Sequence, residues 1–183
     1  MNDNVMPMRY GRLSIGLHWL MVLLIAAVYA TIELRGNFPK GSEARELIKQ
    51  WHFMLGLSVC ALVWLRLIVR WRHPAPLAVA SAKWEQQLAK LAHLALYGLM
   101  IGLPLLGWLI LSAAGKPIPF FGLELPALVG PDKALAGDFK ELHETIAVLG
   151  YWLIGLHAVA ALFHHYVRRD DVLRRMLPQR RQA

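Results

Sequence analysis

The chain has 183 residues, of which 57% are hydrophobic and only 17% are charged. Together with a mean hydropathy of +0.41, this composition excludes an ordinary soluble domain and is typical of an integral membrane protein. A net charge of +8 also occurs in nucleic-acid-binding proteins, but its distribution along the chain indicates membrane topology, and we expect no nucleic-acid partner.

Four apolar runs are long enough to cross a bilayer, and they cover approximately residues 13–34, 47–69, 88–111 and 142–166. No remaining segment is long enough for a separate soluble domain. We therefore expect one all-α membrane domain over residues 1–183, built as a four-helix bundle in contact with lipid. The alternative for the first run is a cleavable signal peptide, but the run is longer than usual for such a segment.

Basic residues are distributed unequally between the two sides that these spans define. The N-terminus, the loop after the second span and the C-terminal tail together hold twelve Lys and Arg residues, whereas the opposite side holds seven. The positive-inside rule then predicts that both termini are cytoplasmic and that residues 112–139 lie on the outer side.

The first two spans carry two histidines and one arginine. His18 lies near the cytoplasmic start of the first span, and His52 lies near the outer start of the second, one turn before Gly56. Arg66 follows His52 by fourteen residues, so it shares the face of His52 but lies in the cytoplasmic half. A buried guanidinium requires a counter-charge, which a haem propionate would supply; the alternative is that Arg66 reaches the inner interface.

The third span carries His93 near its cytoplasmic start and continues into the longest connection of the chain. This connection, 112–139, contains four prolines together with Phe120 and Phe121. It is too apolar for a loose tether, so we expect it to fold as a lid over the outer end of the bundle. Lys116 lies just past the end of the third span, where its charge could attract an anion; the alternative is an ordinary solvated lysine.

The last span carries His143 and His157, fourteen residues apart, with Gly150 midway between them. This spacing places both imidazoles on nearly the same helix face, about 21 Å apart along the axis. The small residue between them would allow large flat groups to approach the backbone. The pattern predicts two cofactor levels.

We pair these histidines by their expected depth in the membrane. The outer pair is His52 with His143, while the inner partner of His18 is either His157 or His164 on depth alone. Two facing imidazoles form an axial pair for haem iron, whereas a zinc site would need three or four converging ligands. Because the chain has one cysteine and no C-x-x-C-H motif, we expect the haem to be bound non-covalently. If histidines fill both axial positions of the iron, no position is open for oxygen, and we expect electron transfer as the chemistry.

The chain resembles the four-helix bacterial cytochrome b561 family. The resemblance runs through segments along nearly the whole chain, namely RLSIGLHWL, ELRGNFP, WHFMLGLS, AHLALYGL, HETIAVLGYWLIGLHAVAALFHHY and LRRMLP. It implies two haems b with His18, His52, His143 and His157 as iron ligands, and it favours His157 over His164. It also implies a bacterial inner-membrane oxidoreductase that oxidises superoxide to dioxygen on the periplasmic side and reduces ubiquinone. We expect no obligate protein partner.

The remaining polar residues in or beside the spans are candidates for substrate contacts. Lys116 is the first candidate for superoxide entry, and His93 and His164, which remain after ligation, are candidates for the quinone site. A different class of function is a haem-bearing membrane anchor that passes electrons between quinone and a periplasmic partner enzyme. A histidine-lined metal transporter is the third alternative.

Overall fold

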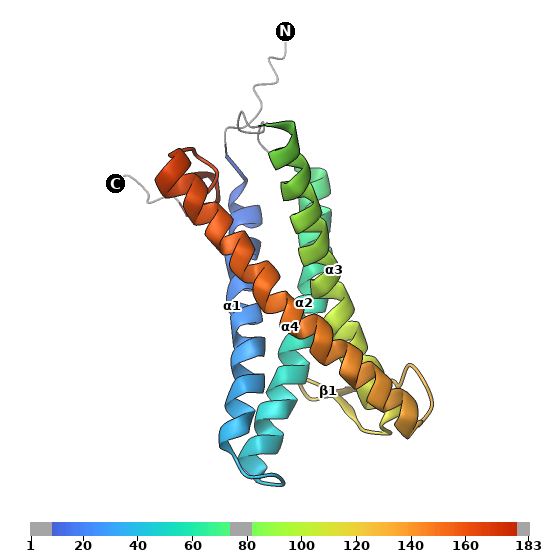
Figure 1. Ribbon diagram of the computed structural model, residues 1–183. Coiled ribbons are helices and arrows are strands. Elements are labelled where there is room, and N and C mark those ends of the chain that lie inside the picture. Colours follow the sequence, from blue (N-terminus) through green and yellow to red (C-terminus); the bar gives the residue numbers. More distant parts are fainter. Residues whose placement is uncertain (1–8, 74–81, 179–183) are drawn as a thin grey trace, which may run out of the picture.

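The computed structural model describes residues 9–73 and 82–178 and consists almost entirely of helices (Figure 1). Each of four helices is long and apolar enough to cross a membrane. The prediction of an all-α four-helix membrane bundle is confirmed. The long helices are α1 (Arg12–Leu34), α2 (Glu43–Arg72), α3 (Lys83–Ala113) and α4 (Lys133–Phe163). The described chain also has three short helical turns: the 3-10 helices η1 (Arg35–Asn37) and η3 (Arg174–Met176) and the π-helix η2 (His164–Arg168).

The helices form a bundle in which α1 packs on α2, α3 packs on α4, and α2 packs on α3. Helix α4 runs obliquely across the others (Figure 1). The start of α1 and the end of α4 lie at one end of the bundle, which we call the terminal end. The turn η1 and the only strands in the described part of the chain lie at the other end, which we call the hairpin end.

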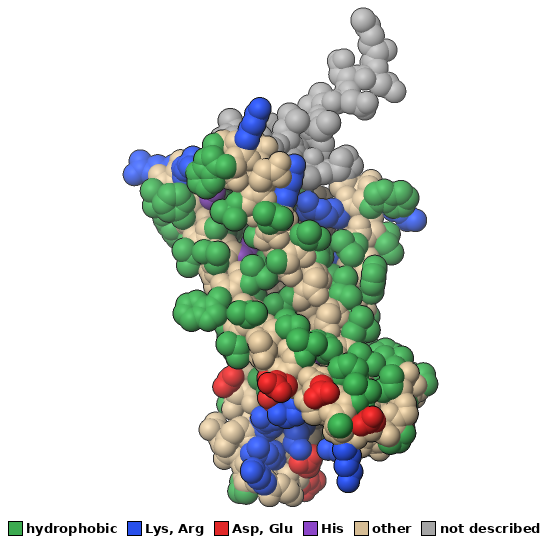
Figure 2. Space-filling view, turned by 45° about the vertical axis from the view of Figure 1, so that its right-hand side comes forward, with side chains coloured by type: hydrophobic (Ala, Val, Ile, Leu, Met, Phe, Trp, Pro, Cys, Tyr) green, Lys and Arg blue, Asp and Glu red, His purple; other side chains and the backbone are tan. Residues whose placement is uncertain are grey.

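Most apolar side chains point outward rather than into a core. The buried cluster consists of Met21, Val59 and Val63, whereas the Trp152 side chain is 77% exposed. Hydrophobic side chains cover the middle of the face seen in Figure 2. An outward-facing apolar surface is costly in water but is expected where lipid tails surround the helices.

A short antiparallel hairpin, β1 (Ile118–Phe120) and β2 (Leu123–Leu125), was not expected in the connection between α3 and α4. Its turn uses Gly122 at a φ of 86°, a left-handed conformation that glycine adopts without strain. The Phe121 ring meets Trp51 of α2, with the centroids 6.3 Å apart. The hairpin is thus held against the hairpin end of α2.

The connection is shorter than the predicted range of 112–139, because α4 begins at Lys133. The Asp132 carboxylate accepts hydrogen bonds from the backbone N–H groups of Ala134 and Leu135, at 2.9 and 3.1 Å. This cap satisfies two donors that a helix leaves free at its start and fixes the helix boundary before the apolar run begins. Similarly, Ser42 caps α2 and starts it at Glu43, ahead of the predicted span at 47.

Charged side chains gather at the two ends of the bundle. On the face in Figure 2, Lys and Arg appear at both ends, whereas Asp and Glu gather toward the hairpin end. Arg180 and Arg181, which belong to the predicted cytoplasmic set, lie outside the described residues.

Candidate functional site

The predicted outer pair of histidines lies together near the hairpin end. His52 of α2 and His143 of α4 face each other with ring centroids 6.4 Å apart and an angle of 69° between the ring planes. His52 Nδ1 lies 2.9 Å from the Val28 carbonyl oxygen, a geometry in which Nδ1 carries the hydrogen and donates it. The Nε2 lone pair of His52 is then available to a metal, and its ring is held in that tautomer.

His143 lacks such a partner within the part of the chain that the structure describes. Its buried Nδ1 has no well-formed hydrogen bond, and the backbone group that acts on the ring is the Leu103 carbonyl of α3. The ring packs against Gly107, where an added Cβ would stand 3.7 Å from His143 Cε1. A buried imidazole nitrogen without a well-formed hydrogen bond holds its ring less firmly than the bonded Nδ1 of His52 does.

Three histidines, rather than the predicted two, converge at the inner level. His93 of α3 and His157 of α4 meet edge to face with ring centroids 5.4 Å apart, and both lie within electrostatic range of His18. His93 Nδ1 is 2.6 Å from the carbonyl oxygen of Ala89, one turn earlier on the same helix. The structure therefore brings His18 and His157 to the same level, with His93 beside them.

Arg66 lies at the inner level and is incompletely paired. Its Nε donates to the Tyr97 hydroxyl at 3.3 Å, while its buried Nη1 has no partner among the described residues. Its charge acts on His18, His93 and His157. A carboxylate at this position would satisfy both the charge and the free N–H group.

Arg35 has the same character at the outer level, and the sequence analysis assigned it no role beyond outer-side charge. Its buried Nε also lacks a partner in the described structure, and its charge acts on His52. The Arg35 carbonyl oxygen accepts a hydrogen bond from Arg45 Nη1 at 3.0 Å, which fixes the turn η1. The sequence signal that could have found Arg35 was its position directly after the end of the first span.

These features fit a haem at each level. The outer level combines the facing imidazoles of His52 and His143 with an unpartnered N–H of Arg35, and the inner level brings His18, His93 and His157 together near an unpartnered N–H of Arg66. Imidazoles suit a haem iron, and a guanidinium N–H suits the propionate groups of its ring. Among the described residues, no group of three or more His, Cys, Asp or Glu side chains is arranged to hold a metal ion directly. The ligand supply therefore favours an iron whose other four ligands come from a porphyrin.

The two glycines predicted to contact cofactors differ in their surroundings. A Cβ added at Gly56 would meet no heavy atom within 4 Å, so space remains beside it. Gly150 is instead packed by the Tyr29 hydroxyl and by Leu99, whose Cδ1 would lie 2.8 Å from an added Cβ. In the structure, the notch at Gly150 thus accommodates neighbouring helices, and cofactor contact at either glycine stays a prediction.

His164 lies at the terminal end of α4 and pairs with an acidic residue. Its Nδ1 is 2.5 Å from Asp170 Oδ2, because η2 and the left-handed Arg169, at a φ of 55°, turn the chain back. Partial burial raises the pKa of Asp170, but the hydrogen bond with His164, the Val172 N–H and the His164 and Arg168 charges together lower it below its ordinary value. The pair is a polar group at the terminal end of the bundle.

Lys116 lies at the opposite end, exposed beside the hairpin. It lines a cavity of 660 Å³ together with Glu124 and mostly apolar residues of the connection. Its backbone N–H bonds the Leu111 carbonyl at 3.0 Å, so the residue is fixed to the end of α3. Its charge also acts on Glu46, which shows that the local field contains both signs.

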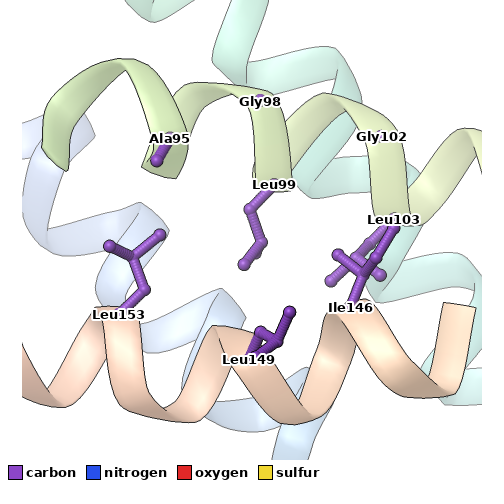
Figure 3. Close-up of a pocket in the computed structure, with 8 residues that line it drawn as sticks. All are labelled: Ala95, Gly98, Leu99, Gly102, Leu103, Ile146, Leu149 and Leu153. Carbon is purple, nitrogen blue, oxygen red and sulfur yellow. The ribbon is translucent and has the colours of Figure 1, made fainter. Parts of the chain in front are cut away.

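A second cavity, of 350 Å³, lies between α3 and α4. Figure 3 shows leucines from the two helices pointing toward each other across it. All eight lining residues are apolar: Ala95, Gly98, Leu99, Gly102, Leu103, Ile146, Leu149 and Leu153. Because no lining side chain can donate a hydrogen bond, this groove lacks the polar groups that would orient a quinone ring.

Residues 9–179 match the family model described as Prokaryotic cytochrome b561. The chain belongs to this family. Its relatives include Cytochrome b561 homolog 1 of Escherichia coli (strain K12), which is 40% identical over 94% of this chain and 99% of that protein. Probable superoxide oxidase CybB of Yersinia pestis is 37% identical over 96% of this chain and 99% of its own length. Cytochrome b561 homolog 2 of Escherichia coli (strain K12) is 33% identical, with 93% and 92% covered.

Membership of the cytochrome b561 family accounts for the main features of the chain. It implies haem b as the cofactor and electron transfer within a membrane as the general function. Four candidate spans in a prokaryotic member of this family indicate a multi-pass protein of the inner membrane. The resemblance proposed from the sequence segments is confirmed at the level of the family.

Proposed function

We propose that this chain is a di-haem b oxidoreductase that oxidises superoxide to dioxygen at the hairpin end and reduces ubiquinone. The observation that carries the proposal is the presence of two separate histidine levels, each with an unpartnered buried guanidinium N–H. The similarity to a relative named Probable superoxide oxidase supports the choice of substrate. The positive-inside rule places the termini in the cytoplasm and the hairpin end in the periplasm.

In this proposal His52 and His143 would hold the outer haem, and His18 and His157 would hold the inner one. Arg35 and Arg66 would neutralise propionates at the respective levels. When bound, haem b supplies a reversible one-electron carrier at each level. Superoxide would give up its electron by outer-sphere contact at the hairpin end.

At the hairpin end, Lys116 attracts the anionic substrate toward the outer level. The outer side has seven basic and eight acidic residues, so its net charge gives no general attraction for an anion. Attraction must therefore be local, and the exposed Lys116 beside the hairpin is placed to provide it. Two superoxide anions give two dioxygen molecules, and the two electrons together with two protons convert one ubiquinone to ubiquinol.

At the inner level, His93 and His164 are the histidines left for the quinone. His93 bonds the Ala89 carbonyl through Nδ1, and His164 bonds Asp170 through Nδ1. In the neutral ring this leaves Nε2 as an acceptor, which can receive a hydrogen bond from a quinol hydroxyl, and Nε2 donates to a quinone oxygen only when both ring nitrogens carry protons. The bond with Asp170 orients His164 for that purpose.

The decisive experiment uses the purified haem-loaded chain alone. Superoxide from an enzymatic source is added with a ubiquinone analogue, and quinol formation is followed with and without superoxide dismutase. We expect quinol formation that requires this chain and is abolished by the dismutase. Two haems per chain without superoxide-driven quinol formation would instead support the haem-bearing membrane anchor, whereas absence of haem would exclude both functions.

A further inference from the structure

Helix α1 supplies no histidine to the outer pair, yet two adjacent residues of α1 contact both helices that do. The Val28 carbonyl oxygen accepts the hydrogen bond from His52 of α2, at 2.9 Å. The neighbouring Tyr29 hydroxyl donates to the Ala147 carbonyl oxygen of α4, also at 2.9 Å. Ala147 is one helical turn from His143, about 6 Å along the axis.

The Tyr29 contact is fitted to the surface of α4. Its hydroxyl occupies the notch at Gly150, and an added Cβ there would overlap this oxygen severely. Gly150 is also the one buried residue of α4 in the described structure. Because the tyrosine ring is rigid and its hydroxyl is bonded, it cannot move aside as freely as the flexible end of Leu99.

We propose that Tyr29 is a positioning residue that sets the geometry of the His52–His143 pair. Val28 and Tyr29 are consecutive, so one short segment of α1 holds both the orientation of the His52 ring and the position of α4. If α4 shifts at Ala147, His143 moves relative to an imidazole whose orientation is fixed. This role rests on the proposed function, because the geometry matters only if the pair holds a haem.

The structure offers close controls for the test. Tyr151 stacks on Tyr29 with ring centroids 4.3 Å apart, but its hydroxyl bonds Glu33, at 2.7 Å, rather than a ligand helix next to a histidine. Gly137 lies on α4 with nothing within 4 Å of an added Cβ. Gly137→Ala thus adds the same methyl group to α4 away from Tyr29, and Tyr151→Phe removes a neighbouring hydroxyl that bonds Glu33 and not Ala147.

The experiment is a double-mutant cycle of Tyr29→Phe and Gly150→Ala in haem-loaded protein. Haem content is measured together with the low-spin EPR signals, which respond to the angle between the axial imidazole planes. The outer signal is identified as the one that His143→Ala removes. We expect Gly150→Ala to weaken retention of the outer haem about tenfold, as overpacking of this size typically does, and to shift its EPR signal.

Adding Tyr29→Phe should restore most of that outer haem, because the overlapping oxygen is gone. Tyr29→Phe alone should shift the outer EPR signal and leave the inner one unchanged, and neither control variant should change either signal. Failure of Tyr29→Phe to rescue Gly150→Ala would show that the Tyr29 hydroxyl does not set the position of α4 at Gly150, and would overturn the inference. A wild-type chain lacking the outer signal would instead refute the proposed function.

Discussion

A hydrogen bond to the other ring nitrogen fixes the tautomer and orientation of a histidine that ligates iron. At the outer level the Val28 carbonyl does this for His52, whereas His143 Nδ1 has no well-formed hydrogen bond within the described structure. At the inner level the ring with a fixed Nδ1 is His93, through Ala89 of its own helix. Hydrogen bonding alone would therefore make His93 a competitor for the place beside His18.

We predict that the two ligand assignments are separable by haem content. His157→Ala should remove the inner haem, whereas His93→Ala should retain it and impair quinol formation, since His93 is proposed as a hydrogen-bond partner of the quinone. His52→Ala and His143→Ala should each remove the same outer haem. Haem per chain and the low-spin signals of purified variants provide the measurement. If His93→Ala loses haem while His157→Ala keeps it, the inner ligand has been assigned to the wrong helix.

The sequence was sufficient to find the outer pair but not the crowded inner level. Counting residues from the charged ends gives depth, and depth distinguished His52 and His143 from every other histidine in a span. Depth does not give the rotation of one helix against another, so the edge-to-face contact of His93 with His157 could not be predicted. For the same reason Arg35 looked like a surface charge, although its Nε is buried.

At the scale of elements, capping residues and turns modify what hydropathy predicts. Hydropathy found four spans, but α4 begins earlier than its apolar run because Asp132 bonds two backbone N–H groups there. The hairpin between α3 and α4 was missed, since three-residue strands carry too little pattern to be recognised. Its apolar composition predicted a lid over the end of the bundle, and in the structure Phe121 of the connection meets Trp51 of α2.

We predict that Lys116→Glu slows superoxide entry while both haems stay bound. The charge reversal lies beside the hairpin and far from the proposed ligands, so it changes the local field rather than the haem sites. Reduction of the protein by superoxide should slow by about twofold to tenfold at low salt. The deficit should shrink as ionic strength rises, because salt screens attraction between exposed charges.

Lys133→Glu serves as the matched control for Lys116→Glu, since Lys133 is also exposed at the hairpin end but lies at the start of α4. It should have a smaller effect on the same stopped-flow rate. An unchanged rate in Lys116→Glu, or a deficit that persists at high salt, would argue against attraction by this lysine.

At the scale of the whole molecule, the histidines and the charged residues are arranged along the long axis of the bundle, which runs from the hairpin end to the terminal end. Both histidine levels lie along that axis, with Lys116 at the hairpin end and the His164–Asp170 pair at the terminal end. The large exposed apolar surface between the ends requires lipid. The chain is therefore organised to connect two membrane surfaces.

Its orientation can be tested directly. Reporter fusions after Arg12 and at the C-terminus should report a cytoplasmic location, and fusions near Lys40 and Pro131 should report a periplasmic one. Inversion of any one reporter would show that the hairpin end has been assigned to the wrong side.

The direction of electron flow along this axis is the last prediction. His143 and His157 are fourteen residues apart on one continuous helix, about 21 Å along its axis. If electrons enter at the hairpin end, His143→Ala should abolish fast reduction of the protein by superoxide, because the remaining level is too far from the surface. His157→Ala should preserve that first reduction and abolish quinol formation.

Stopped-flow absorbance after superoxide mixing, followed by a quinol assay on the same samples, separates the two variants. Protein without either substitution should show both events in order. If His157→Ala blocks entry of electrons and His143→Ala does not, the electrons enter at the terminal end. The protein would then deliver electrons to periplasmic acceptors. The exposed lysine beside the hairpin would attract an electron acceptor, and superoxide would not be the electron donor.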